Sequence, residues 1–507
     1  MLVTMTGIVK WFQSVQALKG VDLEIRPGEV LGLLGENGDG KTTLMRILYG
    51  LLRPDRGQIL IDGQPVTLTS PRDALESGIG MVHQRFVLVP KMSVAENLAL
   101  ALPNLSLLLD LDSVRARVNQ LGTNYGLEID PDAQVDQLPV GLQQRLEILK
   151  ALSRERIQLL ILDEPTACLT PQESEGLFAS LASMADQGLS VVLITHRLDE
   201  AIRASSRITV LRQGEVVASL PASTTSQEEL ATMMIGRPVV FRIERPEVRP
   251  GETVLEISNL IVQGSNGGSA VQGVSLVIRK GEILGIAGVA GNGQKELVEA
   301  LVGLLPVTSG WVQLTGQETT NFPAQEMAKR GVRFVPENLR QGLCPNLSLQ
   351  DNFRLRGWYE SRSPFLAPLP NEGLKQTITQ FGIVTPNLDA NPSQLSGGNQ
   401  QRLVVARELG EKPPRLLIVS NPTQGLDVGS TEMVRNLLIE LRSKGTAILL
   451  VSADLTEILS LSDQIAVLCR GQITGIVRPD QTDEAQLGLM MGTTDSCSGK
   501  EPNGNKD

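Results

Sequence analysis

Short apolar runs alternate along the chain with longer segments in which apolar residues recur at helical spacing. The runs include EVLGLLG at 29–35, LLILD at 159–163 and SVVLITH at 190–196. Uninterrupted apolar runs of this length are typical of strands buried on both faces of a mostly parallel sheet, and the amphipathic segments are typical of the helices that cover it. The pattern therefore predicts an α/β fold.

The chain is internally duplicated. VDLEIRPGEVLGLLGENGDGKTTL at 21–44 is repeated as VSLVIRKGEILGIAGVAGNGQKEL at 274–297. Gly35 and Gly288 are 253 residues apart, whereas Gly141 and Gly398 are 257 apart, so the second copy has gained four residues between these points. A repeat of half the chain predicts two tandem α/β domains, each with a mostly parallel sheet core.

The expected domain boundaries follow from this repeat and from local composition. We expect a first domain at 1–240, a proline-rich linker at 241–252, a second domain at 253–492 and a polar, flexible tail at 493–507.

Composition and charge exclude several classes of partner. The 507 residues carry a formal net charge of -10, which argues against general binding of nucleic acid or of an anionic lipid surface. The four cysteines form no CxxC pair, and the amino terminus has no secretory signal pattern. The most apolar stretch is broken by Pro103 and is too short to span a bilayer. We therefore expect a cytoplasmic protein.

GENGDGKT at 35–42 matches GxxxxGK[ST] between an apolar run and a helical segment. Glycines let backbone N–H groups converge on phosphate oxygens at a helix N-terminus. Lys41 supplies a positive charge to the β- and γ-phosphates, and Thr42 offers a hydroxyl to Mg²⁺. The expected ATP-binding residues of this loop are Gly35, Glu36, Asn37, Gly38, Asp39, Gly40, Lys41, Thr42 and Thr43.

Four polar residues stand at or next to strand ends and are candidates for catalysis and metal binding. We expect Asp163 to hold Mg²⁺ and Glu164 to polarise the attacking water. Gln84 and His196 could reach the metal ion, the water or the γ-phosphate. A buried strand that ends in a solvated acidic turn remains the alternative for 159–164. The other histidine, His83, is expected to serve packing or the surface.

In their order and spacing, these elements resemble the ATP-binding cassette (ABC) ATPases from Met5 to about Gly492. LSGGNQQR at 395–402 is similar to the family's signature motif, and LPVGLQQR at 138–145 is a defective version. The resemblance implies P-loop NTPase domains in which each signature completes the ATP site of the opposite domain. It also implies that Phe12 stacks on adenine, with Trp11 as the alternative and a core role open for either.

The second copy has lost the catalytic side chains. Gln294 stands in place of Lys41, Glu337 of Gln84, Ser420 of Asp163, Asn421 of Glu164 and Ala453 of His196. By the resemblance, the intact site combines the first copy's residues with Ser396, Gly397, Gly398 and Asp427. The degenerate site would combine the second copy's residues with the first signature, where Pro139 replaces the serine. In the first copy, Thr170 stands at the position equivalent to Asp427. We expect one hydrolytic site and one site that at most binds nucleotide.

Asp39 departs from the family pattern, which usually has a small neutral residue at this position of the loop. A carboxylate close to a polyanion should weaken nucleotide binding unless its side chain faces water.

Tandem domains with a short linker and a degenerate second copy resemble the ATPase subunits of simple-sugar and nucleoside importers, with a closer likeness to the nucleoside branch. The resemblance implies a peripheral protein at the cytoplasmic face of the cell membrane, whose halves pair within the chain. Each domain would carry a helical subdomain. The protein's partners would be membrane-spanning permease subunits, docked on the helical subdomain at 88–137, and through them an extracytoplasmic substrate-binding protein. No nucleic acid and no direct contact with the transported molecule are expected. The alternatives are a tandem ABC ATPase that acts on ribosomes or DNA and, for 88–137, an ordinary helical insertion.

Overall fold

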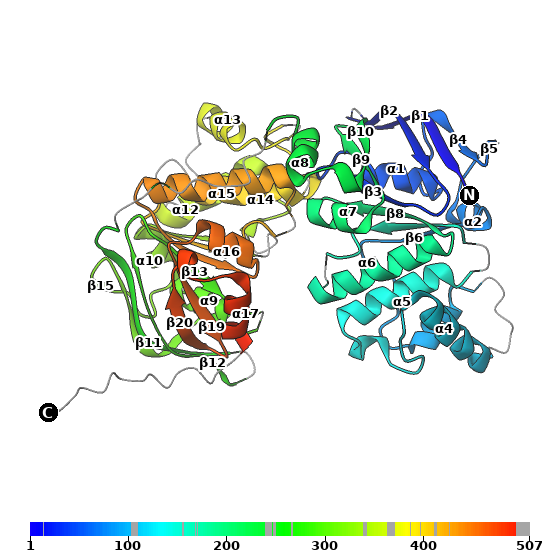
Figure 1. Cartoon of the computed structure of the whole chain (residues 1–507). Coiled ribbons are helices and arrows are strands. Elements are labelled where there is room, and N and C mark those ends of the chain that lie inside the picture. The colour runs from blue at the N-terminus through cyan, green and yellow to red at the C-terminus, as the bar shows by residue number, and fades with distance from the viewer. Residues whose placement is uncertain are drawn as a thin grey trace. The chain divides into compact units, whose positions relative to one another are not determined.

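The computed structural model divides the chain into two compact units that carry the two copies of the repeat (Figure 1). Unit 1 comprises Met1–Val239 with Asp427–Gly429, and unit 2 comprises Val240–Leu426 with Ser430–Asp507. The residues that the structure describes are 1–13, 15–102, 110–154, 157–167, 169, 171–238, 246, 250–264, 267–289, 291–337, 342–361, 371–385, 387–395, 397–409, 413–424 and 426–492. The predicted tail and most of the predicted linker lie outside these residues.

Unit 1 contains a mostly parallel sheet, as the apolar runs predict. The strand order is β10 (Glu215–Pro221), β9 (Arg207–Arg212), β3 (Val30–Leu34), β8 (Ser190–Thr195), β7 (Leu159–Asp163) and β6 (Ile79–Val82). All neighbours are parallel except the edge pair β10 and β9. A mostly parallel sheet of this kind places the carboxyl ends of its parallel strands along one edge, where ligands bind in open α/β folds.

A second sheet in unit 1 is antiparallel and was not predicted from the apolar runs. Its order is β2 (Val15–Ile25), β1 (Val3–Phe12), β4 (Arg56–Ile61) and β5 (Gln64–Val66). Buried and exposed residues alternate along much of β1 and β2, because only one face of this sheet packs on the core. An alternating pattern of this kind gives no continuous apolar run.

The core of unit 1 lies on both faces of the parallel sheet. Leu159 and Ile161 of β7 pack in a cluster with residues of the antiparallel sheet and of α1 (Lys41–Leu48). Leu160 and Leu162 pack in another cluster with helices on the other face. Because successive residues of a strand point to opposite faces, a strand buried on both faces must be apolar throughout.

The remaining helices of unit 1 connect and cover the strands (Figure 1). They are α2 (Pro71–Glu76), α3 (Val94–Ala99), α4 (Leu111–Tyr125), α5 (Val140–Leu152), α6 (Pro171–Asp186), α7 (Leu198–Ala204) and α8 (Gln227–Ile235), with 3₁₀ turns η1 (Val135–Gln137) and η2 (Ala222–Thr224). Apolar side chains of α3 and α4 pack in one cluster with those of α5 and α6, so the described part of 88–137 forms helices with a shared core.

Unit 2 repeats this architecture. Its mostly parallel sheet has the order β16 (Val332–Val335), β17 (Leu416–Ser420), β18 (Ala447–Ser452), β13 (Ile283–Ala287), β19 (Gln464–Cys469) and β20 (Gln472–Val477). The antiparallel sheet has the order β12 (Ser269–Arg279), β11 (Thr253–Gln263), β14 (Val307–Leu314) and β15 (Gln317–Glu318).

The helices of unit 2 follow the same plan. They are α9 (Gln294–Leu301), α10 (Ala324–Lys329), α12 (Leu349–Ser361), α13 (Asn371–Gln380), α14 (Gly397–Leu409), α15 (Val428–Ser443), α16 (Leu455–Leu461) and α17 (Glu484–Gly492), with 3₁₀ turns η3 (Pro392–Gln394) and η4 (Pro479–Gln481). Among the helices of the described residues in either unit, none has the length and apolar composition required to cross a bilayer.

Candidate functional site

The glycine-rich loop joins β3 to α1 in unit 1, as expected. Gly38 and Gly40 have φ angles of 98° and 101°, a left-handed conformation that glycine adopts without strain. A side chain at Gly40 would also lie 2.8 Å from the carbonyl oxygen of Ala17. Gly40 caps α1, so the unpaired N–H groups of the first helical turn face the loop. This arrangement suits a phosphate group.

Lys41 is the first residue of α1, and its side chain folds back over the loop. The ammonium group donates to the carbonyl oxygens of Gly35 at 2.7 Å and Glu36 at 2.9 Å. Burial lowers the pKa of Lys41, and the carboxylate of Asp39 acts in the opposite direction. The loop thus holds a buried cation that is bonded to the loop's own carbonyl groups.

Asp39 does not face water, which was the condition for its charge to be harmless to nucleotide binding. Its side chain is buried and accepts hydrogen bonds from the backbone N–H of Glu36 at 2.6 Å and of Gln213 at 2.8 Å. Burial raises the pKa of Asp39 above its ordinary value. The Gln213 contact was missed because it involves only the backbone of that residue, which leaves no signal in the sequence.

Glu164 is bonded to Gln84 and His196, two residues that the sequence placed near the metal ion, the water or the γ-phosphate without predicting this contact. Its two carboxylate oxygens contact Nε2 of Gln84 at 2.8 Å and Nδ1 of His196 at 2.9 Å. Burial alone would raise the pKa of Glu164. The hydrogen bonds from His196 and Gln84, together with the positive charges of His196 and Lys41, outweigh burial and lower the pKa below its usual range. The carboxylate is therefore ionised at neutral pH and oriented from both sides, as a group that polarises water must be.

Asp163 and Thr42 also lie together. The Thr42 hydroxyl donates to Oδ1 of Asp163 at 3.3 Å. Burial, followed by the adjacent charge of Glu164, raises the pKa of Asp163 to about 6. A buried carboxylate beside a hydroxyl, with the Gln84 amide bonded to the neighbouring Glu164, offers the oxygen donors that Mg²⁺ prefers. The residues present fit the expected metal ion.

The aromatic residues at the end of β1 are surface residues. Trp11 is 49% and Phe12 44% exposed, which excludes a core role for either ring. The ammonium group of Lys10, on the same strand, lies 5.9 Å from the centroid of the Phe12 ring. His83 packs edge to face on Tyr49, with ring centroids 6.0 Å apart, as expected for a packing residue.

Glu200 is a supporting residue that was not predicted from the sequence. Its buried carboxylate accepts from the hydroxyl groups of Thr166 at 2.6 Å and Thr195 at 3.1 Å. It thereby fixes the segments that follow β7 and β8, which carry Glu164 and His196. Glu457 contacts Thr423 in the same way in unit 2, at 2.8 Å. The sequence contained a signal for this role, because Glu200 and Glu457 are 257 residues apart and therefore occupy equivalent positions in the two copies.

The two signature segments begin equivalent helices. In unit 1, Pro139 caps α5 without a side-chain hydrogen bond, and Gly141 lies in the first turn. In unit 2, Gly397 and Gly398 begin α14, whereas Ser396 lies outside the described residues, as does Thr170 of unit 1. Asp427 directly precedes α15.

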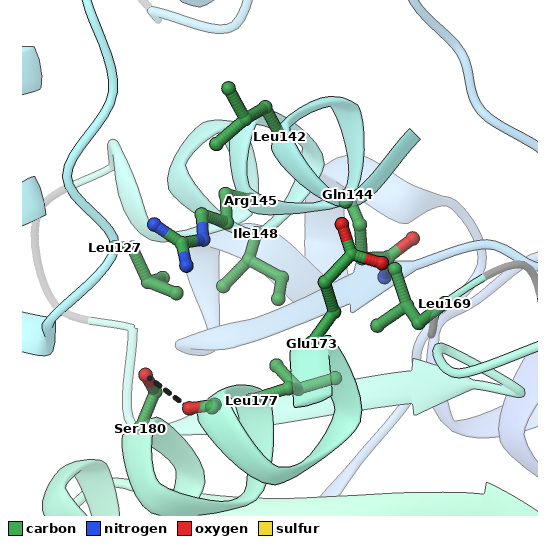
Figure 2. A pocket seen from close by; sticks show the side chains of 11 residues that line it. Leu127, Leu142, Gln144, Arg145, Ile148, Leu169, Glu173, Leu177 and Ser180 are labelled. Carbon is green, nitrogen blue, oxygen red and sulfur yellow. Dashed lines mark hydrogen bonds between the residues drawn. The ribbon is translucent and has the colours of Figure 1, made fainter. Parts of the chain in front are cut away.

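A small cavity of about 40 Å³ lies between α5 and α6 (Figure 2). It could hold about one water molecule, not a nucleotide. The Glu173 carboxylate lies directly against Gly141, so that a side chain there would require Glu173 to move. The start of α5 therefore faces an acidic group, whereas the counterpart of Glu173 in unit 2 is the small Ser430.

In unit 2 the site residues of unit 1 are replaced by groups bound to backbone. Asn421 accepts from the N–H of Ala453 at 2.8 Å, and Gln294 donates to the carbonyl of Val289 at 2.9 Å. Lys295 lies 3.9 Å from Glu299 on the exposed side of α9. None of these described residues supplies a carboxylate at the end of β17.

Two comparisons with known sequences bear on this site. A model of the ABC transporter family matches residues 18–167 and 271–424. The chain is 42% identical to the glucose import ATP-binding protein TsgD13 of Haloferax volcanii, over 96% of this chain and 95% of that protein. It is 41% identical to the nucleoside import ATP-binding protein NupA of Lactococcus lactis, over 97% and 98%. It is 40% identical to the guanosine import ATP-binding protein NupO of Bacillus subtilis, over 98% and 99%.

A likeness to solved structures extends along most of the chain. The structure titled RNase-L Inhibitor is 20% identical and covers 91% of this chain and 87% of its own, with a TM-score of 0.60. A likeness at this identity concerns the fold alone.

The two adjacent carboxylates should affect stability in opposite directions. Asp163→Asn should raise the free energy of unfolding of the nucleotide-free protein by up to about 3 kcal/mol at pH 7 to 8, because the native pKa lies above the unfolded one. Above pH 6 the cost of the buried charge is fully present, and it disappears as pH falls toward 4. Thermal unfolding followed from pH 4 to 8 measures this gain.

Glu164→Gln is the matched comparison. Its carboxylate has a lowered native pKa, so the charge stabilises the fold above the unfolded pKa and the benefit is lost as pH falls through the native one. The substitution should therefore lower the melting temperature at neutral pH. Equal shifts of the same sign in both variants would contradict the assigned environments.

Proposed function

The chain belongs to the ATP-binding cassette (ABC) transporter family and is an ATPase, and we propose that it energises a membrane importer of nucleosides or related simple sugars. The observation that carries this proposal is the identity of about 40%, over nearly the whole chain, to proteins named as import ATP-binding proteins for guanosine, nucleosides and glucose. The rival function, on ribosomes or DNA, has no support from these relatives.

We propose that hydrolysis takes place at the unit 1 site. Glu164 orients and polarises a water molecule, and His196 and Gln84 fix its carboxylate from two sides. Lys41 and the N–H groups of the loop bind the β- and γ-phosphates of ATP. Thr42, Asp163 and Gln84 would hold Mg²⁺, which supplies charge neutralisation for the transferred phosphoryl group.

The second site is proposed to be non-hydrolytic. Asn421 has no basic carboxylate, and its side-chain oxygen is already bonded to the N–H of Ala453. Gln294 is neutral where unit 1 has Lys41. On the signature of unit 1, Glu173 brings a negative charge to the first turn of α5, which disfavours a phosphate there.

We further propose that the halves pair so that each signature completes the other unit's site. The intact site would then combine the unit 1 residues with Ser396, Gly397, Gly398 and Asp427 of the second copy. The distribution of the substituted residues supports this pairing. Under it, the altered residues of unit 2 and the altered signature of unit 1 belong to the same site, and the other site keeps all its expected residues.

A groove in unit 2 suits a membrane-spanning partner. It has a volume of about 660 Å³ and lies between α10, β16, α12 and α14. Its lining combines apolar and charged side chains, among them Leu304, Met327 and Leu355 and the charged Glu299, Arg333, Arg407 and Glu408. Leu304 is 58% exposed, an exposure of apolar surface typical of an interaction site. We propose that a short amphipathic segment of a permease subunit docks here, in addition to the expected docking on the helices of 88–137.

The asymmetry of the two sites can be tested with alanine variants matched for backbone strain. Glu164 and Asn421 both have left-handed φ angles, 49° and 44°. Glu164→Ala should reduce the hydrolysis rate by about 100-fold or more, as loss of a general base does, whereas Asn421→Ala should retain most of it. The measurement is steady-state phosphate release by the full chain, and similar losses in both variants would refute the asymmetric site assignment.

The transport function predicts co-purification with membrane proteins. From gently solubilised cells, the chain should be isolated with membrane-spanning subunits, and nucleosides with their binding protein should stimulate ATP hydrolysis by the reconstituted complex more than monosaccharides do. Monosaccharide stimulation alone would move the substrate to the sugar branch. Ribosomes or nucleic acid without membrane subunits would refute the importer proposal.

The groove can be tested through its own cysteine. Cys344 lies in the groove and is exposed, whereas Cys469 is buried. With Cys168 and Cys497 changed to Ser, the bound permease should slow maleimide labelling of Cys344. Leu304→Asp should weaken complex formation without reducing basal ATP hydrolysis, and Leu489→Asp, at an exposed position on α17, is the control. If the permease does not slow labelling of Cys344 and Leu304→Asp assembles normally, the groove is not a docking site for the permease.

A further inference from the structure

Asp39 and Lys41 contact opposite ends of one peptide group in the phosphate loop. The carbonyl oxygen of Gly35 and the N–H of Glu36 belong to the same peptide. Lys41 donates to that oxygen at 2.7 Å, and the Asp39 carboxylate accepts from that N–H at 2.6 Å. Because a trans peptide points its oxygen and its hydrogen in opposite directions, the aspartate fixes the peptide in the orientation that presents its oxygen to Lys41.

The Asp39 carboxylate also ties the loop to the turn between β9 and β10. The second carboxylate oxygen accepts from the N–H of Gln213 at 2.8 Å, and the backbone carbonyl of Asp39 accepts from the N–H of Gly214 at 3.1 Å. An ionised carboxylate accepts at both oxygens, whereas an asparagine side chain has one acceptor oxygen. The full set of contacts therefore depends on aspartate.

Unit 2 shows which of these contacts the fold requires. Asn292 occupies the position of Asp39, accepts from the N–H of Arg470 at 3.2 Å, and accepts through its carbonyl from Gly471 at 2.9 Å. Gln294 donates to the Val289 carbonyl, as Lys41 does to that of Glu36. The loop and the turn are thus joined in unit 2 without any charge. The negative charge of Asp39 is not needed for the fold.

We propose that Asp39 is a positioning residue that lowers the affinity of the phosphate loop for nucleotide, by holding Lys41 on the loop carbonyls and offsetting its positive charge. A carboxylate bonded to the N–H end of the peptide polarises it and makes its oxygen a stronger acceptor for the lysine. Phosphate oxygens must compete with these bonds for the ammonium group. The same charge also repels the phosphates directly.

The consequence for turnover is faster exchange of nucleotide. ADP keeps a phosphate that Lys41 can contact, so a retracted and partly neutralised lysine weakens product binding as well as ATP binding. AMP lacks the β- and γ-phosphates and should be little affected. Asp39 therefore acts on the steps of binding and release, while Glu164 acts on the chemical step.

The test is nucleotide binding by the full chain carrying Asp39→Asn, a substitution already present at the equivalent place in unit 2. The dissociation constants for Mg·ADP and a slowly hydrolysed ATP analogue should fall by roughly tenfold, and that for AMP should change by less than about twofold. In steady state, KM for ATP should fall while kcat does not rise. Asp39→Ala, which leaves a small neutral residue, should act in the same direction.

Controls separate this inference from the site assignment on which it rests. Lys41→Ala should abolish tight nucleotide binding. Tight binding by this variant would refute the assignment of the glycine-rich loop as the phosphate-binding site. Asn292→Asp places the same charge in unit 2 and should leave binding at the intact site unchanged. Unchanged or weaker ADP binding in both neutral Asp39 variants, with a wild-type melting profile, would overturn the role of Asp39. Equal tightening of AMP and ADP would do so too.

Discussion

The site depends on a geometric constraint, which is that parallel strands in register end at one edge of their sheet. In unit 1, Leu34 pairs with Thr195 and Asp163 pairs with Ile194, so the segments that follow β3, β7 and β8 start at the same level. Side chains more than 100 residues apart in the sequence therefore come within hydrogen-bond distance, as Thr42 and Asp163 do. The constraint belongs to the backbone, and it holds in unit 2 as well, where Ser420 and Asn421 stand in place of the two carboxylates.

The environment gives two adjacent carboxylates different properties. Asp163 is the last residue of β7 and lies in the interior, where burial raises its pKa to about 6. The chain then turns at Glu164 through a left-handed φ of 49°, and this turn places the second carboxylate between Gln84 and His196. Burial thus dominates the environment of Asp163, whereas both carboxylate oxygens of Glu164 are hydrogen-bonded. Such a difference between neighbouring acids is typical of sites in which one binds metal and the other activates water.

The two copies separate the requirements of folding from those of chemistry. Both glycine-rich loops have left-handed glycines at equivalent positions, and both are joined to the turn between the last two strands of the sheet by the same backbone bonds. Both strands β7 and β17 are followed by a left-handed residue, Glu164 or Asn421. The backbone is therefore the same in both copies although unit 2 lacks the charged groups of the unit 1 site, because these groups contribute little to the packing of the sheet.

The sequence by itself determined the duplication and the α/β class, and it predicted the residues of the unit 1 site, because buried parallel strands require continuous apolar runs and the loop requires glycine at fixed spacing. It did not predict the antiparallel sheets, since a sheet with one solvated face leaves only a weak alternating pattern. Nor could it show that Asp39 turns inward onto Glu36 and Gln213, or that Glu200 supports the catalytic segments. These contacts depend on backbone N–H groups and on residues brought together by the sheet, and only the tertiary structure decides which of them meet.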